Sequence, residues 1–252
     1  MGLFDLPAPL FSAVDNLMGG LPAYPRLLIW ATLTGIISMV LYWLCSAQEK
    51  TGAAKERALE ARRRMAAYEG TEFDEMWPLA KESLAASGKH FGIVLGPALL
   101  SSLPALAIIV WISNQFGYTL PQPGETVAIY TEPATALVGL ASAGEPDDGT
   151  YQVTYPQPGQ STAITAASEE VLVTLPLEAA IPVVHKKVWW NSLIANGNGY
   201  LDNNQSVEAI YFELQPQEFI GIGPGWIRGW EFSYFVLLII VSLVIKVAFK
   251  IH

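Results

Sequence analysis

The chain has 252 residues, of which 52% are hydrophobic and only 15% are charged. Soluble domains carry about 25% charged residues, so this composition argues against a purely cytosolic enzyme. The single cysteine excludes a disulfide framework within the chain and any multi-cysteine metal site, and the net charge of −9 argues against a nucleic-acid-binding protein, which needs a basic surface.

Residues 1–26 contain a short amphipathic pattern. Ser12, Asp15 and Asn16 fall on one side of a helix whose other side is apolar. Two placements are open for this helix: on the outer surface of a membrane, or against the protein's own external domain. The apolar residues at helical spacing are Leu10, Phe11, Val14, Leu17 and Met18.

Three apolar runs are long enough to cross a membrane. Residues 27–48 and 91–118 contain no Asp, Glu, Lys or Arg, and only Lys246 interrupts the third run, residues 232–249. A helix rises about 1.5 Å per residue and the hydrocarbon layer is about 30 Å thick, so each run can span it. The long stem of Lys246 can carry its charge to the membrane surface. We therefore predict three spans, the last lying in residues 232–252 with a short tail.

Residues 49–90, between the first two runs, are expected to form a helical hairpin. Five residues of its first arm repeat at 4-3-4-3 spacing, which is typical of a coiled-coil seam. Gly70 is placed to end this arm, and Thr71 is placed to cap a second helix that starts near Phe73 and continues into the second span. The seam residues are Ala54, Ala58, Ala61, Met65 and Tyr68.

The charged residues predict the orientation. Residues 49–90 hold eight basic residues, whereas residues 119–231 hold three basic and thirteen acidic ones. Short basic loops stay in the cytoplasm, so we expect the hairpin and the C-terminus to be cytoplasmic. The N-terminus and residues 119–231 are then outside the cell's inner (plasma) membrane. The run Arg62, Arg63 and Arg64 is a candidate cytoplasmic contact, either as a solvated basic face or with anionic lipid headgroups.

Residues 119–231 change to short strands of alternating polarity, separated by Pro and Gly, which favours a β-sandwich-like domain. Trp226 and Trp230 lead into the third span and are candidate anchors in an aromatic belt. The fold class we expect is an integral membrane protein of α and β structure, with three transmembrane helices, a cytoplasmic coiled-coil hairpin and an extracytoplasmic β domain. Examples of the expected strands are residues 126–131, 151–155, 171–175 and 209–214.

The sequence contains no pattern typical of a catalytic or metal site. His90, His185 and His252 lie far apart along the chain, and there is no HExxH spacing. A phosphate-binding loop, a Gly-x-Ser-x-Gly elbow and a Cys/His nucleophile pair on one side of the membrane are also absent from the sequence. We therefore expect a protein that is not an enzyme and that binds no cofactor.

The order of these segments resembles the minimal three-span core of the Oxa/YidC membrane-insertase superfamily. The resemblance is to the small branch that includes the archaeal YidC-like proteins and the insertase subunit of the ER membrane complex, and it covers about residues 25–118 and 232–252. The stretches that carry it are residues 62–65 and 68–70, Glu75–Leu79, and residues 91–104 with Gly96–Leu100 and Leu103–Pro104.

The resemblance implies a groove, open to the cytoplasm and to lipid, that eases the passage of polar peptide segments into the bilayer. Such a groove lowers the cost of several kcal/mol for an unpaired polar group in hydrocarbon. Pro97 and Pro104 are expected to kink the second span. Two interpretations of this region are open: its small residues allow close packing with another helix, or the kink leaves a polar cleft. The partners implied are membrane lipids and client membrane proteins. Candidate groove residues, each also suited to ordinary packing, are Thr32, Thr34, Ser38, Ser101, Ser102 and Lys246.

Two departures from the family pattern support an alternative. Bacterial insertases often carry an arginine in the groove, whereas Arg26 lies at the outer end of its helix, and the external domain replaces a short loop. The alternative is a non-catalytic accessory or structural subunit of a larger membrane complex, docked through the spans and the external domain. A third interpretation is a sensor whose external domain binds a ligand.

Overall fold

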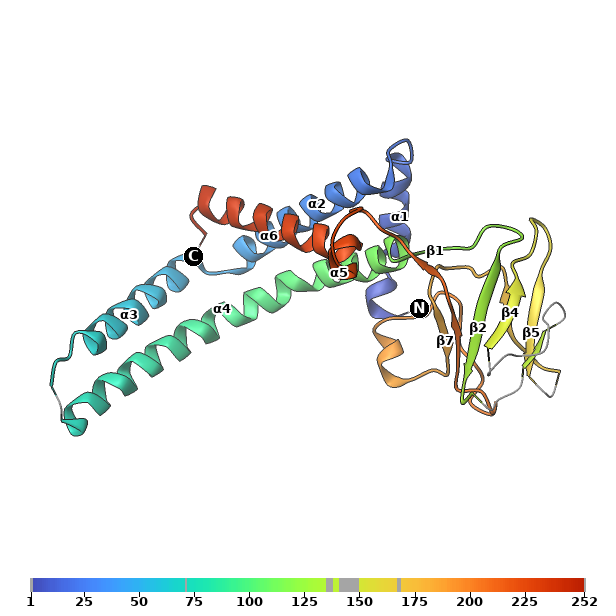
Figure 1. Cartoon of the computed structure of the whole chain (residues 1–252). Coiled ribbons are helices and arrows are strands. Elements are labelled where there is room, and N and C mark those ends of the chain that lie inside the picture. The colour runs from blue at the N-terminus through green and yellow to red at the C-terminus, as the bar shows by residue number, and fades with distance from the viewer. Residues whose placement is uncertain (1, 71, 135–137, 141–149, 167–168, 252) are drawn as a thin grey trace. The chain divides into compact units, whose positions relative to one another are not determined.

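The computed structural model describes residues 2–70, 72–134, 138–140, 150–166 and 169–251. The chain has mixed helix and sheet structure. Among the described residues, three helices are long and apolar enough to cross a membrane: α2 (Ala23–Cys45), α4 (Phe73–Phe116) and α6 (Trp230–Ala248). Each contains most of one of the three apolar runs of the sequence (Figure 1).

The chain divides into two compact units. One comprises Met1–Leu27 with Ala107–Ser233, and the other comprises Leu28–Leu106 with Tyr234–His252. The division falls inside α2, α4 and α6, so the first unit contains the β strands and the second contains most of each apolar helix.

The first unit begins with η1 (Leu3–Asp5) and α1 (Ala8–Leu17). Ser12 and Phe11 of α1 both contact α4, because the Trp111 indole N–H donates to the Ser12 hydroxyl at 3.0 Å and the Trp111 ring meets Phe11 edge to face. Leu10 and Leu17 of the same helix are exposed. The helix is therefore packed on the protein and also keeps an apolar face open, which is compatible with both placements expected from the sequence.

The strands of the first unit form antiparallel sheets. A four-stranded sheet has the order β4-β2-β8-β7, a three-stranded sheet the order β3-β5-β6, and a two-stranded pair joins β1 to β9. The strand bounds are β1 (Tyr118–Thr119), β2 (Thr126–Glu132), β3 (Val138–Leu140), β4 (Thr150–Thr154), β5 (Thr162–Ala166), β6 (Val171–Leu175), β7 (Val183–His185), β8 (Ala209–Phe212) and β9 (Gln215–Pro216). Two short helices complete the unit, η2 (Trp189–Ser192) and α5 (Gly225–Arg228).

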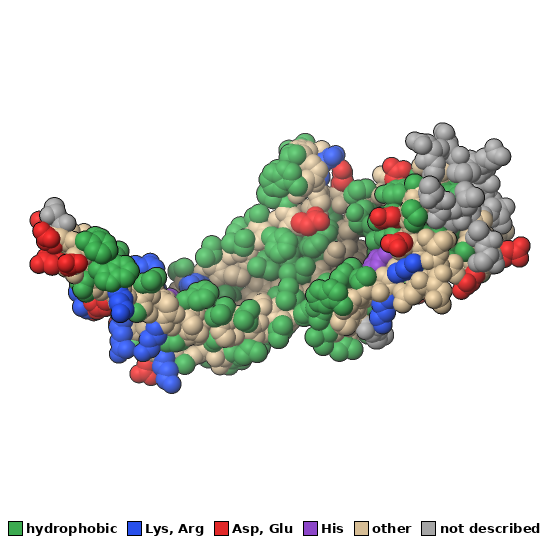
Figure 2. Space-filling view, turned by 90° about the horizontal axis from the view of Figure 1, so that it is seen from below, with side chains coloured by type: hydrophobic (Ala, Val, Ile, Leu, Met, Phe, Trp, Pro, Cys, Tyr) green, Lys and Arg blue, Asp and Glu red, His purple; other side chains and the backbone are tan. Residues whose placement is uncertain are grey.

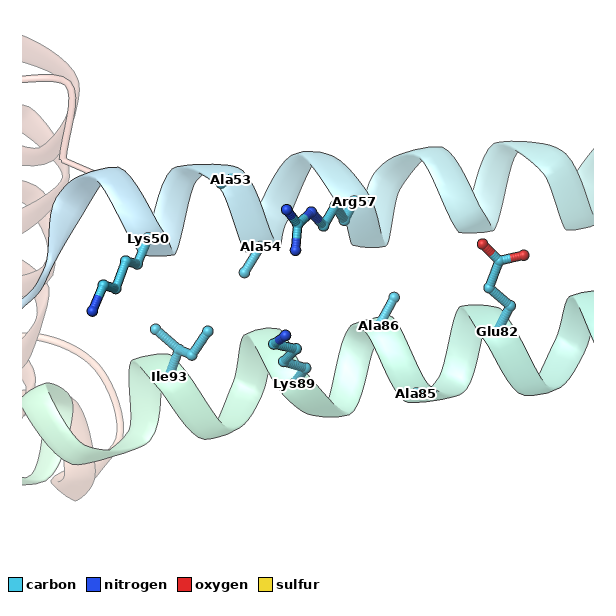
Figure 3. Close-up of a pocket in the computed structure, with 9 residues that line it drawn as sticks. All are labelled: Lys50, Ala53, Ala54, Arg57, Glu82, Ala85, Ala86, Lys89 and Ile93. Atoms are coloured by element: carbon cyan, nitrogen blue, oxygen red, sulfur yellow. The ribbon is translucent and has the colours of Figure 1, made fainter.

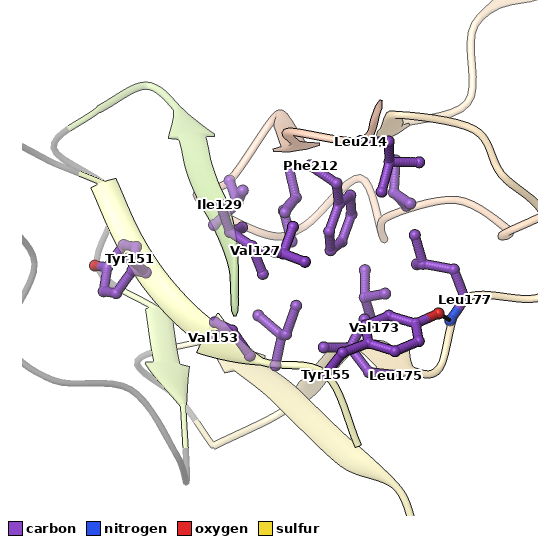
Figure 4. Packing of buried hydrophobic residues seen from close by; sticks show 14 of the residues in the cluster. Val127, Ile129, Tyr151, Val153, Tyr155, Val173, Leu175, Leu177, Phe212 and Leu214 are labelled. Carbon is purple, nitrogen blue, oxygen red and sulfur yellow. Dashed lines mark hydrogen bonds between the residues drawn. The ribbon is translucent and has the colours of Figure 1, made fainter. Parts of the chain in front are cut away.

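The two larger sheets share one apolar core. Alternate residues of the strands point into it, as with Val127 and Ile129 of β2 and with Val173 and Leu175 of β6 (Figure 4). The four strands named as examples from the sequence coincide with β2, β4, β6 and β8 to within two residues at each end. Strands β3, β5 and β7 complete the two sheets; the examples named from the sequence did not include them.

In the second unit, α3 (Gln48–Ala66) runs antiparallel to the first half of α4 and forms a helical hairpin with it (Figures 1 and 3). The predicted seam is confirmed at Ala54, Ala58 and Ala61, which are buried. It is wrong at Met65, which is exposed, and at Tyr68, because α3 ends at Ala66 and not near Gly70. Tyr68 lies beyond the end of α3, so the helical spacing no longer sets the direction of its side chain. The predicted cap Thr71 lies outside the described residues.

Helix α4 is continuous from the hairpin into its apolar run, with Pro78, Pro97 and Pro104 inside it. Elsewhere in this unit, α2 and α6 approach closely at Gly35. A Cβ atom at Gly35 would lie 3.0 Å from Val241 Cγ1 and 3.3 Å from the Leu238 carbonyl oxygen. A small residue is therefore required here for contact between the two helices.

The substitution Gly35→Leu is expected to destabilise the α2–α6 contact. Overpacking of a close contact costs about 1–3 kcal/mol, and here the backbone of Leu238 cannot move aside without shifting α6. Gly96→Leu in α4 is the control, because nothing lies within 4 Å of a Cβ atom at that position. Unfolding of the purified chain by increasing SDS in mixed micelles measures the difference. Equal stability of the two variants would contradict the packing role of Gly35.

A buried tyrosine of the β core makes a second prediction. The Tyr155 hydroxyl accepts a hydrogen bond from the Leu177 N–H at 2.9 Å, and burial raises the pKa of Tyr155 above its ordinary value. Tyr155→Phe leaves that N–H without its acceptor, so the free energy of unfolding should fall by about 1 kcal/mol.

The same pKa shift gives a pH dependence. The unfolded chain releases the Tyr155 proton more easily than the folded one, so this contribution to stability is intact below about pH 10 and lost as the pH rises above it. Urea unfolding of the full chain in detergent from pH 8 to pH 11 should show a smaller alkaline loss for Tyr155→Phe than for the parent. An identical alkaline loss in both would exclude the titration of Tyr155 as a cause.

Candidate functional site

Two of the three candidate groove residues of α2, Thr32 and Thr34, already donate their hydroxyl protons to backbone carbonyls. Thr34 donates to the Trp30 carbonyl at 2.8 Å and accepts a hydrogen bond from the Tyr234 hydroxyl of α6 at 2.9 Å. Thr32 donates to the Leu28 carbonyl at 2.9 Å. Thr34 thus joins α2 to α6 and is fully buried, whereas Thr32 and Ser38 are partly exposed.

The candidate residues of α4 and α6 are arranged similarly. Ser101 donates to the Ala98 carbonyl at 3.0 Å and Ser102 to the Leu99 carbonyl at 2.8 Å, so both bond to their own helix. Lys246 is exposed in the last turn of α6. We compared the six candidate residues with five cavities that described residues form. Thr32 lines one of these cavities, beside Leu28 on α2, and the other five candidates line none of them. The structure therefore pairs Thr34 with α6 and does not gather the six residues around one of these cavities.

Tyr234, the hydrogen-bond partner of Thr34, was not among the residues singled out from the sequence. It lies near the start of an apolar run and looks like an aromatic belt residue, but its side chain is fully buried. The available signal was a hydroxyl in a helix interior, which needs a hydrogen-bond partner when it leaves water.

Of the two candidate interface anchors, Trp226 is 68% exposed, whereas Trp230 is only 6% exposed and is packed inside the first unit.

The hairpin contains a cavity of about 530 Å³ between α3 and α4 (Figure 3). Lys50 and Arg57 line it from α3, and Lys89 lines it from α4. The neighbouring Arg64 joins the two arms through an ion pair with Glu82 of α4 at 3.1 Å, and it also pairs with Glu60 of its own helix at 3.0 Å. The other members of the predicted arginine run, Arg62 and Arg63, are exposed, which fits a solvated basic face. The remaining lining residues are Ala53, Ala54, Glu82, Ala85, Ala86 and Ile93.

The turn of the hairpin carries an exposed apolar surface, which we call the tip patch. It consists of Phe73, Met76 and Trp77 on the first turns of α4 (Figure 2). Phe73 is 63% exposed and Trp77 57% exposed, and their rings stack at 5.9 Å. Next to the patch, Tyr68 donates to the Glu75 carboxylate at 2.9 Å; desolvation and this carboxylate raise the pKa of Tyr68.

In the first unit, a buried ion pair holds three helix ends together. Arg26 at the start of α2 donates through Nε to Asp15 Oδ1 of α1 at 3.0 Å and makes a second contact with Oδ2. The Arg26 guanidinium also lies over the ring of Phe116, the last residue of α4, at 5.6 Å. Asp15 is only 3% exposed, so this pair is shielded from solvent. It fixes α1 against α2 and α4.

Within the described residues, no group of His, Cys, Asp and Glu side chains is arranged to hold a metal ion. Comparison with known proteins finds no family model, curated protein or solved structure that matches the chain.

Removing one partner of the buried ion pair is expected to be costly. Asp15→Asn leaves the Arg26 charge without its counter-charge, and breaking such a buried pair costs about 3–5 kcal/mol. The double variant Asp15→Asn/Arg26→Gln should recover part of this loss. Glu178→Gln, at an exposed carboxylate of the same unit, is the control and should be close to neutral.

Thermal unfolding of the purified chain in a neutral detergent checks this order of stabilities. If Asp15→Asn and Glu178→Gln melt at the same temperature, the ion pair does not stabilise the fold.

Proposed function

We propose that the chain is an insertase-like assembly factor for membrane proteins, with α2, α4 and α6 spanning the cell's inner (plasma) membrane. The basic residues of the hairpin support a cytoplasmic position for α3 and the start of α4, and the acidic balance of residues 119–231 supports an external β domain. The element order, with the hairpin between the first two apolar helices, supports the same assignment as the resemblance to the Oxa/YidC superfamily.

The tip patch is the observation that carries this proposal. From Phe73 to Phe91, where the apolar run begins, α4 rises by about 27 Å. The interfacial region on each side of the hydrocarbon is only about 5–8 Å thick, so lipid does not cover the patch. Stacked aromatic side chains kept in water mark a site for an apolar partner. For a protein embedded in the membrane, a newly made apolar segment of another membrane protein has this chemistry.

Helix α4 supplies a direct route from this patch to the bilayer, because it is one continuous helix from Phe73 to Phe116. A client segment bound at the tip patch is held beside the membrane at a fixed distance. Its polar groups need hydrogen-bond partners as they enter hydrocarbon. The hydroxyls of Thr32 and Ser102 have donated their protons to backbone carbonyls but keep oxygen lone pairs that can accept from a client N–H. Lys246, exposed at the end of α6, can bind a client carboxylate.

One observation favours the accessory-subunit alternative. The Thr34 hydroxyl is buried against Tyr234, and α6 presents a long exposed face of large aliphatic side chains that a partner helix can cover as well as lipid can. This face consists of Ile239, Ile240, Leu243 and Val244. In that case the tip patch would bind one fixed neighbour and not a series of clients.

Crosslinking distinguishes the two functions. A photoreactive phenylalanine analogue in place of Trp77, in cells making membrane proteins at normal levels, is expected to capture many newly made membrane proteins. The same analogue in place of Leu59, an exposed residue of α3 outside the tip patch, is the control and should capture few. Native purification then identifies stable partners. A single stoichiometric set of subunits, with no varied clients at Trp77, would overturn the assembly-factor proposal.

Loss of the tip patch is expected to lower client insertion. The triple variant Phe73→Ser/Met76→Ser/Trp77→Ser removes the aromatic anchors, and loss of such anchors costs at least about 2 kcal/mol of binding, or more than tenfold in affinity. Insertion of a small membrane protein into proteoliposomes that contain the purified chain should fall accordingly. Leu59→Ser is the matched control. Unchanged insertion by the triple variant would exclude the patch from the client pathway.

A further inference from the structure

The cavity between the two hairpin arms has a basic lining and apolar walls. Lys50, Arg57 and Lys89 approach it from both helices, whereas the alanines of α3 and α4 leave the space between the arms open (Figure 3). A volume of about 530 Å³ is within the range of small-ligand sites.

The charges in the cavity are unbalanced. Glu82 is the one carboxylate among its lining residues, and Arg64 already pairs with it at 3.1 Å. Within the described part of the chain, none of Lys50, Arg57 and Lys89 forms an ion pair.

The sequence explains why these three cations lack partners. The positions three and four residues away on the same helix, where ion pairs form, hold uncharged residues around Lys50 and Lys89. Around Arg57 the single exception is Glu60, which pairs with Arg64 at 3.0 Å. The cavity therefore keeps three positive charges that are available to a ligand.

The cavity lies where the charged hairpin changes to apolar helix. Lys89 precedes the start of the apolar run at Phe91 by two residues, and Ile93, inside that run, also lines the cavity. Lys50 lies in the first turn of α3, five residues after α2 ends at Cys45. With the apolar helices in a bilayer, these positions coincide with the phosphate groups of the lipid headgroups.

We propose that this hairpin cavity binds the headgroup of an anionic phospholipid. Lys50, Arg57 and Lys89 contact the phosphate and any further anionic group, while Ile93 adjoins the start of an acyl chain. Charge complementarity selects this occupant, because three cations without carboxylate partners discriminate against a zwitterionic headgroup. The bound lipid fixes the two arms of the hairpin at the membrane surface. The inference requires the apolar helices to lie in a membrane and holds for an assembly factor and for an accessory subunit alike.

The test compares two matched double variants of the full chain, purified in dodecyl maltoside. Lys50→Gln/Lys89→Gln removes one lysine of the cavity from each arm. Lys55→Gln/Lys81→Gln removes one exposed lysine outside the cavity from each arm and is the control. Native mass spectrometry with added dioleoyl phosphatidylglycerol or dioleoyl phosphatidylcholine measures the dissociation constants.

The parent is expected to bind phosphatidylglycerol at least about tenfold more tightly than phosphatidylcholine. The cavity variant should lose at least about tenfold of the phosphatidylglycerol affinity and the control less than about threefold, since each basic residue near an anionic headgroup is worth about fivefold. A third variant, Ala86→Leu, keeps every charge but fills the cavity, and should also release the lipid.

Three results would overturn the proposal. Equal losses in the two double variants would show non-specific attraction to the whole hairpin. Equal affinity for the two lipids would show that the headgroup charge is not recognised. Competition by inorganic phosphate at concentrations as low as those of the lipid would assign the cavity to a soluble phosphate compound.

If the cavity variant loses helix content by circular dichroism, the single variants Lys89→Gln and Lys81→Gln make the same comparison.

Discussion

A polar group inside an apolar helix must find its hydrogen-bond partner within the protein, and this constraint orders the helices of the chain. In the second unit it pairs the Tyr234 hydroxyl with Thr34, which brings α6 against α2 where Gly35 leaves room for the contact. In the first unit it pairs Arg26 with Asp15, which fixes α1 against the ends of α2 and α4. The helices are therefore located by a few polar contacts as well as by shape, and their remaining apolar faces stay free for lipid or for another protein.

The same constraint changes how the candidate groove is understood. From the sequence alone, a serine or threonine in a span is expected to offer a client both a hydrogen-bond donor and an acceptor. In the structure, Thr32, Ser101 and Ser102 donate to carbonyls of their own helix, so they offer lone pairs and not protons. Such a surface accepts hydrogen bonds from a peptide but donates none, and this limits the help it gives to a polar segment. The strongest support for handling of other proteins consequently comes from the tip patch, outside the apolar runs.

Features with a local period were predictable from the sequence, and features that join distant segments were not. Hydropathy over some 20 residues located the three apolar helices, and alternation located β2, β4, β6 and β8, because burial on one face repeats along the chain. The helical spacing found Ala54, Ala58 and Ala61, but it could not show that α3 ends at Ala66. The partner of Asp15 and the lining of the hairpin cavity depend on segments that the fold brings together, and no local pattern contains that information.

The charge distribution connects the hairpin cavity with the tip patch. Residues 48–90 contain eight basic and eight acidic residues, so the hairpin is neutral as a whole. Its charges are nevertheless segregated: Lys50, Arg57 and Lys89 lie beside the apolar helices, whereas half of the acidic residues lie in residues 69–75 at the tip (Figure 2). In the proposed membrane orientation, an anionic membrane surface attracts the first end, which lies within about one Debye length, 8–10 Å, of the headgroups. The second end lies about 27 Å along α4 from the start of the apolar run, which is beyond that range. In that orientation the hairpin is held by its base, and the length of α4 keeps the aromatic side chains of the tip patch in water, where a partner can reach them.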